Sequence, residues 1–410
     1  MQWESIGFND EPFRTHPITA NTLYLYTGNE DKITESRFAL QSNNIVMVIE
    51  GSRGVGTTSF GNFLRFKAEE AKHYFTPISE IRVEPTWNAD TLMAAIIANI
   101  VSTLELHHLD AMKNKKKFKE AKAIVQRVTE IYHSFGLTAF GVGASYGQAG
   151  GGGQPMIMPT QVLSQHLEDL VQVVYDLGFK YGILIQLNNL DIGVVQNEAH
   201  IKVLLNIMRD YFQMAGTSWL LVGDTSLRRF IAKEVDRVDD IVAHETEIMP
   251  LSESDYLALI EKRVQYFRIN SQVELPVDKD VLLYMYKITK GRLRFIFGLL
   301  NRLFNSLQLG ILSEHVTLAL AKPIVINYSR ERISRFNLSP NEELVLKLVA
   351  QKDGVQVKEI ADILGKNQSY ISNILAQLST HKLVSHTKEW RNHYYHASID
   401  ACIIYLDDVS

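Results

Sequence analysis

The chain has 410 residues, which at about 150 residues per domain corresponds to two or three domains. Hydrophobic residues make up 46% and charged residues 21%, a composition that excludes disordered and collagen-like chains and indicates a folded, soluble protein. Lys and Arg total 42 against 46 Asp and Glu, so the net charge of -4 gives no overall attraction to nucleic acid or acidic lipid. Binding to either one therefore depends on a local patch.

The single cysteine and the amino-terminal sequence bear on the compartment. Cys402 cannot form an internal disulfide, which fits a reducing environment. The opening Met-Gln-Trp-Glu-Ser has no basic stretch before an apolar run, and no segment reaches the ~18 consecutive apolar residues of a membrane span. We therefore expect a cytoplasmic protein that makes no membrane contact.

From about residue 45, short β-branched runs alternate with longer amphipathic stretches, a pattern typical of βαβ units and a covered parallel sheet. Helices are expected between the runs. The stretch 87–107 has Leu92, Ile96 and Ile100 at helical spacing and is expected to pack on the sheet. The predicted fold class is therefore α/β with a three-layer parallel sheet. The expected strands are 45–50, 80–84, 138–145, 182–187 and 218–222.

A glycine-rich stretch interrupts this pattern, because seven of the thirteen residues 141–153 are glycine. Glycines have no side chain to hold the backbone in place, so we expect a mobile surface loop there. A long helix is expected to begin near Thr160 and to continue the α/β domain.

After Pro250 the strand pattern stops and helical periodicity takes over. Helices are expected at 252–268, 278–289, 291–307 and 313–322, and Pro323 is expected to break the chain between domains. The remaining segment alternates short helices with two candidate strands. The predicted domains are 1–250 (α/β, nucleotide-binding), 251–325 (helical lid) and 326–410 (winged helix-turn-helix).

The first expected strand runs into a glycine-rich loop and a helix, the context in which a G-x-x-x-x-G-K-[ST] phosphate loop is meaningful. Gly51 and Gly56 match this pattern and Thr58 supplies the hydroxyl that would ligate magnesium, but Thr57 stands in place of the lysine. Backbone N–H groups and the helix amino terminus still favour an anion. The alternative is an ordinary tight turn. The predicted nucleotide-binding residues of the loop are Gly51, Arg53, Gly54, Val55, Gly56, Thr57, Thr58 and Ser59.

This motif resembles that of the AAA+ branch of the P-loop ATPases, and the chain from about residue 10 to 410 is similar in layout to origin-recognition initiators, with overlap to STAND signalling ATPases. In that family the fourth expected strand ends in two acidic residues, where this chain has Asn188 and Asn189. An amide neither takes a proton from water nor carries negative charge toward magnesium. The lysine is missing at Thr57 and the two carboxylates are missing at Asn188 and Asn189, and all three groups take part in ATP hydrolysis. We therefore expect little or no ATP turnover.

The same resemblance implies roles for three further residues. Asp224 follows the strand that resembles the one carrying the first sensor. Arg294, in a Gly-x-x-Arg sequence, is the expected second sensor of the outermost phosphate, with an ion-pair role as the alternative. Arg237 resembles the arginine that a neighbouring subunit offers to the nucleotide, with pairing to the acids around it as the alternative.

The carboxyl-terminal segment has the pattern of a helix-turn-helix, with helices expected at 339–349, 357–364 and 367–379 around a turn at Gly365. Strands expected at 383–387 and 393–396 flank a wing at 388–392. Residues 330–410 contain ten Lys and Arg and ten Asp and Glu, so this module is neutral, and a protein-binding role remains the alternative. The predicted DNA-binding residues are Lys366, Asn367, Gln368, Ser369, Tyr370, Asn373, Lys388 and Arg391.

Six lysines between Lys113 and Lys122 form a second basic stretch, interpreted as a solvated helix face with contact to the DNA backbone as the alternative. No cluster with the spacing of a metal site or of nucleophilic catalysis is present in the sequence.

The main hypothesis is a nucleotide-responsive DNA-binding protein with ATP or ADP as ligand, Mg²⁺ as an optional companion, and double-stranded DNA as partner. A homo-oligomer or a protein partner is left open. The alternatives are a STAND-like signalling or scaffold protein, and a working ATPase that uses Arg53 in place of the lysine.

Overall fold

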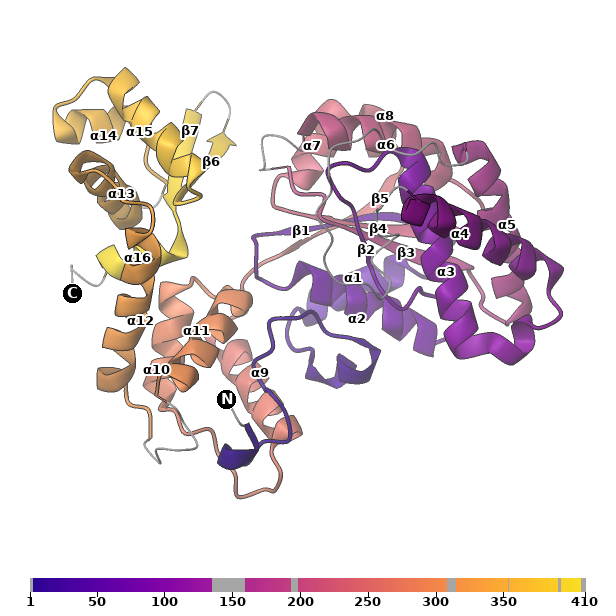
Figure 1. Cartoon of the computed structure of the whole chain (residues 1–410), viewed down its shortest axis with the longest axis horizontal. Helices are drawn as coiled ribbons and strands as arrows, with labels where there is room; N and C mark the ends of the chain where they lie inside the picture. Colours follow the sequence, from indigo (N-terminus) through magenta and orange to yellow (C-terminus); the bar gives the residue numbers. More distant parts are fainter. Residues whose placement is uncertain are drawn as a thin grey trace. The chain divides into compact units, whose positions relative to one another are not determined.

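The computed structural model describes residues 3–134, 159–192, 198–307, 315–352, 354–389 and 392–406. The chain forms two compact units (Figure 1). One comprises Pro17–Met249, and the other combines Met1–His16 with Pro250–Ser410. The backbone therefore passes from one unit to the other twice, each time at a proline. The first sixteen residues, which the sequence division placed with the α/β domain, group with the helices that follow Pro250.

The unit 17–249 is built on a five-stranded sheet in the order β2-β3-β4-β1-β5. All four neighbouring pairs are parallel, so the carboxyl ends of the strands meet at one edge. Glu50, at the end of β1, lies in register with Gly223 of β4 and Glu247 of β5. The strands are β1 (Val46–Gly51), β2 (Ile81–Arg82), β3 (Ile183–Asn188), β4 (Thr217–Gly223) and β5 (Val242–Ile248).

Helices cover both faces of the sheet and make it the middle of three layers. Alternate residues of β1 divide between two hydrophobic clusters: Val46 and Val48 pack with α3, α5 and α6, whereas Met47 and Ile49 pack with α1 and α2. This confirms the predicted α/β class. The helices of this unit are η2 (Ala20–Leu25), α1 (Glu30–Ala39), α2 (Thr57–Glu70), α3 (Ala89–Met112), α4 (Lys116–Ser134), α5 (Thr160–Asp176), α6 (Glu198–Phe212), α7 (Leu227–Glu234) and α8 (Asp236–Asp239).

The helix predicted around 87–107 is α3, and its apolar stripe of Leu92, Ile96 and Ile100 is fully buried against the sheet. Within the described part of the chain, α3 is the one helix long and apolar enough to cross a membrane by length and composition. Its most apolar window is 78% buried inside the unit, as in a core helix.

Four of the expected strands, 45–50, 80–84, 182–187 and 218–222, overlap β1, β2, β3 and β4, although β2 is only two residues long. The strand and glycine loop expected within 138–153 lie outside the described residues. Strand β5 was not predicted from the sequence. Its sequence Val-Ala-His-Glu-Thr-Glu-Ile is polar at several positions because this edge strand exposes part of its surface.

The other unit contains α9 (Glu253–Phe267), α10 (Lys279–Ile288), α11 (Leu293–Ser306) and α12 (Leu318–Ser334), with η1 (Trp3–Ile6) from the amino terminus. Three of these helices are those predicted. The break predicted at Pro323 is wrong, because this residue lies inside α12. Ala321, Val325 and Ser329, spaced by four residues, bury one continuous face on both sides of the proline, so packing holds the helix together.

The carboxyl-terminal part of this unit has its own hydrophobic cluster, to which helices and a hairpin contribute. The two strands pair antiparallel, with Val384 opposite Ala397. The elements are α13 (Pro340–Lys352), α14 (Val357–Leu364), α15 (Gln368–Thr380), β6 (Val384–Glu389), β7 (Asn392–Ala397) and α16 (Ile399–Leu406). The order from α13 to β7 matches the one predicted from the sequence, whereas α16 was not predicted.

Candidate functional site

The glycine loop joins the carboxyl end of β1 to α2, as predicted. Gly54 and Gly56 have φ angles of 94° and 112°, a backbone region that side chains rarely adopt. Gly51 is needed for a different reason, because a Cβ there would lie 2.5 Å from the carbonyl oxygen of Ile248. The loop therefore requires glycine at each of these three positions to turn tightly at the sheet edge.

The loop ends at the amino terminus of α2, where Gly56 is the cap residue and has no side chain to accept a hydrogen bond. The N–H groups of Thr57, Thr58 and Ser59 belong to the first helical turn, where intrahelical acceptors are lacking. Together with the helix dipole they favour an anion at this position. Arg53, at the middle of the loop, is exposed, and Val55 is buried.

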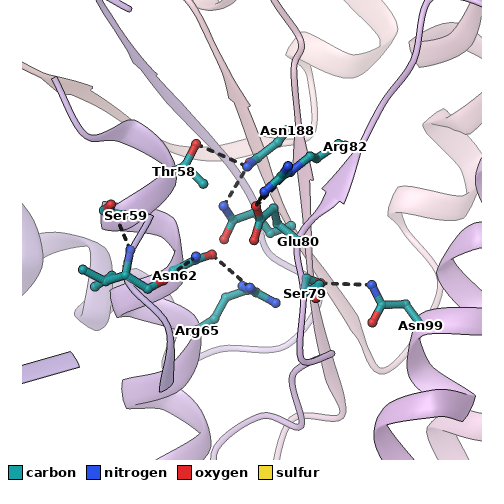
Figure 2. Close-up of polar contacts among 11 residues, drawn as sticks. Thr58, Ser59, Asn62, Arg65, Ser79, Glu80, Arg82, Asn99 and Asn188 are labelled. Carbon is teal, nitrogen blue, oxygen red and sulfur yellow. Dashed lines mark hydrogen bonds and ion pairs between the residues drawn. The ribbon is translucent and has the colours of Figure 1, made fainter. Parts of the chain in front are cut away.

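A chain of neutral polar side chains connects the loop to β3 (Figure 2). The Asn188 amide Nδ2 donates to Thr58 Oγ1 at 3.3 Å, and its Oδ1 accepts from Gln186 Nε2 at 2.9 Å. Asn188 is 3% exposed and Gln186 1%. The structure thus brings together two residues predicted from separate motifs, Thr58 and Asn188. Asn189, by contrast, is exposed and has a φ of 66°.

Magnesium, which this kind of loop implies, does not fit these residues. The ion prefers several oxygen ligands, usually including a carboxylate. Here an amide donor points at the hydroxyl of Thr58, and the buried neighbour of Asn188 is another amide. Across the described residues, no group of three or more His, Cys, Asp or Glu side chains could hold a metal ion.

One face of α2 carries a buried arginine that was not predicted as a functional residue from the sequence. Arg65 is fully buried and donates from Nη1 to the carbonyl of Pro77 at 2.8 Å. Its Nη2 donates to Asn62 Oδ1 at 2.9 Å (Figure 2). Burial lowers the pKa of Arg65 to about 10, against the attraction of Glu80 and Glu69. The available sequence signal was a charged residue between two apolar ones, Leu64 and Phe66.

A second unanticipated residue is Glu50, which immediately precedes the loop. Its Oε2 accepts from the backbone N–H of Arg228 at 2.8 Å, in the first turn of α7. Burial raises the pKa of Glu50 to about 7, helped by repulsion from Glu247, Asp224 and Glu245.

Asp224, the predicted first sensor, accepts at Oδ1 from the N–H of Ser226 at 3.0 Å and so helps to start α7.

The resemblance implied that two arginines, Arg237 and Arg294, contact the nucleotide. Arg237 is exposed and forms an ion pair of 3.3 Å with Asp210 of α6. The alternative to a role between subunits was an ion pair with the acids close to Arg237 in sequence. Asp210 is more distant in sequence, but it forms such an ion pair on the surface. Arg294 is exposed in the first turn of α11 and belongs to the other compact unit, so its role as a phosphate sensor stays a prediction.

In the carboxyl-terminal module, Gly365 ends α14 with a φ of 59°, and Asn367 caps α15 by accepting from the N–H of Ser369 at 2.8 Å. The predicted residues at this helix start are exposed, and Tyr370 is 41% exposed. They share one end of α15: Lys366, Asn367, Gln368, Ser369, Tyr370 and Asn373. Lys388 lies in β6, and Arg391 lies outside the described residues.

The lysine stretch at the start of α4 is largely paired with acids. Lys117 binds Asp169 at 2.9 Å, and Lys115 binds Asp176. Lys122 pairs with Glu105 of α3. These ion pairs support the interpretation of this stretch as a solvated helix face that contributes to packing between helices.

No family model matches the chain, and no curated protein matches it. Among solved structures, the chain is similar to ORC1 of Aeropyrum pernix in complex with DNA, with 14% identity, 94% of this chain and 93% of that chain covered, and a TM-score of 0.49. The chain is also similar to ORC2 of the same organism in ADPNP and ADP complexes, with 14% identity, 98% of each chain covered, and a TM-score of 0.49. A third similar structure is a Walker-type ATPase of Pyrococcus abyssi, with 12% identity, 96% of this chain and 99% of that chain covered, and a TM-score of 0.48. No residue role in this chain follows from similarities at this level.

Proposed function

We propose that the chain is an AAA+ P-loop protein of the initiator or regulator kind that binds ATP or ADP, with little or no hydrolysis, and binds double-stranded DNA through its carboxyl-terminal module. The observation that carries the proposal is the loop between β1 and α2. It turns on Gly54 and Gly56 and presents the uncapped amino terminus of α2 beside the hydroxyl of Thr58.

Slow hydrolysis follows from the side chains around that loop. Thr57 offers no cation to the outer phosphates, and its methyl group faces Gly51, so that a Cβ on Gly51 would lie 2.9 Å from it. Asn188 stands buried beside Thr58 and has no carboxylate to orient or deprotonate a water molecule. Binding by backbone dipoles does not depend on either of these side chains.

Native mass spectrometry and calorimetric titration with ADP test the nucleotide site. We expect bound nucleotide, and we expect Gly56→Ala to abolish it because the loop cannot keep a φ of 112° with a side chain. Gly178→Ala is the matched control, since Gly178 has a φ of 88° with equally open space around its Cβ, in the turn after α5. Equal loss of binding in both variants would contradict a role for the loop.

A phosphate-release assay tests the absence of turnover. Wild-type protein should release phosphate at the rate of a blank, and Thr58→Ala should leave that rate unchanged. Release at about one turnover per second, a normal rate for an ATPase, that disappears in Thr58→Ala would overturn this part of the proposal. Such a result would favour an active enzyme that uses Arg53.

DNA binding is proposed from the exposed start of α15, which presents amides, hydroxyls and Lys366 after the turn at Gly365. A salt titration of duplex binding should show affinity falling steeply with salt, with a smaller slope for Lys366→Ala. Lys352→Ala, at the far end of α13, is the matched control. Absence of duplex binding at low salt would favour the scaffold alternative, in which the neutral module contacts protein.

A further inference from the structure

The hydroxyl of Thr58 is the loop group that would ligate a divalent metal, and a hydrogen-bond donor points at it instead. Asn188 Nδ2 lies 3.3 Å from Thr58 Oγ1 and donates to it. A cation that approached the same oxygen would meet the positive end of an N–H bond. Thr58 keeps its own hydrogen for an anion, because it accepts in this contact.

The amide of Asn188 is held in place by a second amide. Gln186 Nε2 donates to Asn188 Oδ1 at 2.9 Å. Gln186 itself is confined against α2, since a Cβ added to Gly61 would lie 2.7 Å from its Oε1. Rotating either amide by 180° exchanges a neutral donor for a neutral acceptor, so no arrangement of this pair supplies negative charge.

Two carboxylates at the carboxyl edge of the sheet, those of Glu50 and Asp224, accept hydrogen bonds from backbone N–H groups at the start of α7. Glu50 accepts from the N–H of Arg228 at 2.8 Å, and Asp224 accepts from the N–H of Ser226 at 3.0 Å. Both oxygens stabilise the start of α7. Among the residues that the structure describes, no set of three acidic or imidazole side chains is arranged to bind a metal ion.

From these contacts we propose that the loop binds its nucleotide without a divalent metal ion. This inference rests on the proposed nucleotide site and defines its ligand class as the free nucleotide rather than its magnesium complex. The phosphates are held by the first N–H groups of α2, by the Thr58 hydroxyl and by the Asn188 amide, all of which are donors. A metal-bound diphosphate has less negative charge to offer these donors and gains no protein ligand in return.

The test is calorimetric titration of the full chain with ADP in excess Mg²⁺ and in excess EDTA. The dissociation constant in Mg²⁺ should equal or exceed the one in EDTA, because the magnesium complex offers less negative charge to the donors. Binding that is about tenfold or more tighter in Mg²⁺ would overturn the inference and leave the proposed nucleotide site intact. Absence of ADP binding in both buffers would overturn the nucleotide site itself, and the inference with it.

The variant Asn188→Asp should convert the site to metal dependence. Its carboxylate repels phosphate in EDTA, so affinity should fall by about tenfold or more, and Mg²⁺ should restore it. Asn206→Asp in α6, which adds the same charge to the same unit, should show neither effect. As a second readout, electron paramagnetic resonance should detect Mn²⁺ bound with ADP in Asn188→Asp only. Mn²⁺ bound with ADP by the wild-type protein would contradict the proposal, and this measurement does not depend on the folding of any variant.

Discussion

Glu50→Gln is expected to stabilise the protein at neutral and alkaline pH. Burial and the nearby carboxylates of Glu247, Asp224 and Glu245 raise the pKa of Glu50 from 4.5 to about 7. The folded state therefore disfavours the ionised side chain, and stability is lost as the pH rises through 7. The shift corresponds to about 3.4 kcal/mol, of which about 1 to 2 kcal/mol remain after allowance for the solvent that reaches this partly exposed group.

The variant keeps an acceptor oxygen for the N–H of Arg228, so the hydrogen bond at the start of α7 is retained. Urea unfolding followed by tryptophan fluorescence provides the measurement, since Trp219 is fully buried in the strand next to β1. The variant and the wild type should have equal free energies of unfolding near pH 4.5, with the variant more stable by about 1 to 2 kcal/mol at pH 8. A difference independent of pH, or a variant less stable at pH 8, would refute the reasoning.

Three further changes test the description of the fold, each by urea or thermal unfolding. Arg65→Met removes the buried guanidinium and leaves the oxygens of Asn62 and Pro77 without this donor. The free energy of unfolding should therefore fall by about 3 kcal/mol, and a fall of less than about 0.5 kcal/mol would contradict the contacts described. Ser252→Ala removes the hydroxyl cap of α9 and should lower stability by about 1 kcal/mol, whereas Ser252→Asp should retain most of it. Pro323→Ala should raise stability by about 1 kcal/mol or more by restoring one hydrogen bond inside α12, and a decrease would show that the proline is favoured there.

Periodicity predicted the buried parts of the fold well, because burial is what produces it. The stripe on α3 and the apolar strands β1, β3 and β4 are enclosed on both faces, so their sequences carry a strong pattern. Strand β5 at the sheet edge alternates weakly and was missed. Pro323 illustrates the opposite error, in which a strong local preference is outweighed by the packing of residues four positions apart.

For the candidate site, spacing predicted the loop because its glycines are required by backbone geometry at fixed intervals. The approach of Thr58 to Asn188 joins residues 130 positions apart, and no local pattern predicts that contact or the direction in which the amide donates. The raised pKa of Glu50 has the same origin, since strands that are distant in sequence bring its acidic neighbours together.

The α/β unit is entered between His16 and Pro17 and left between Met249 and Pro250. The proline rings add stiffness by fixing φ at both places. A cut at either crossing alone would leave the two units covalently joined at the other.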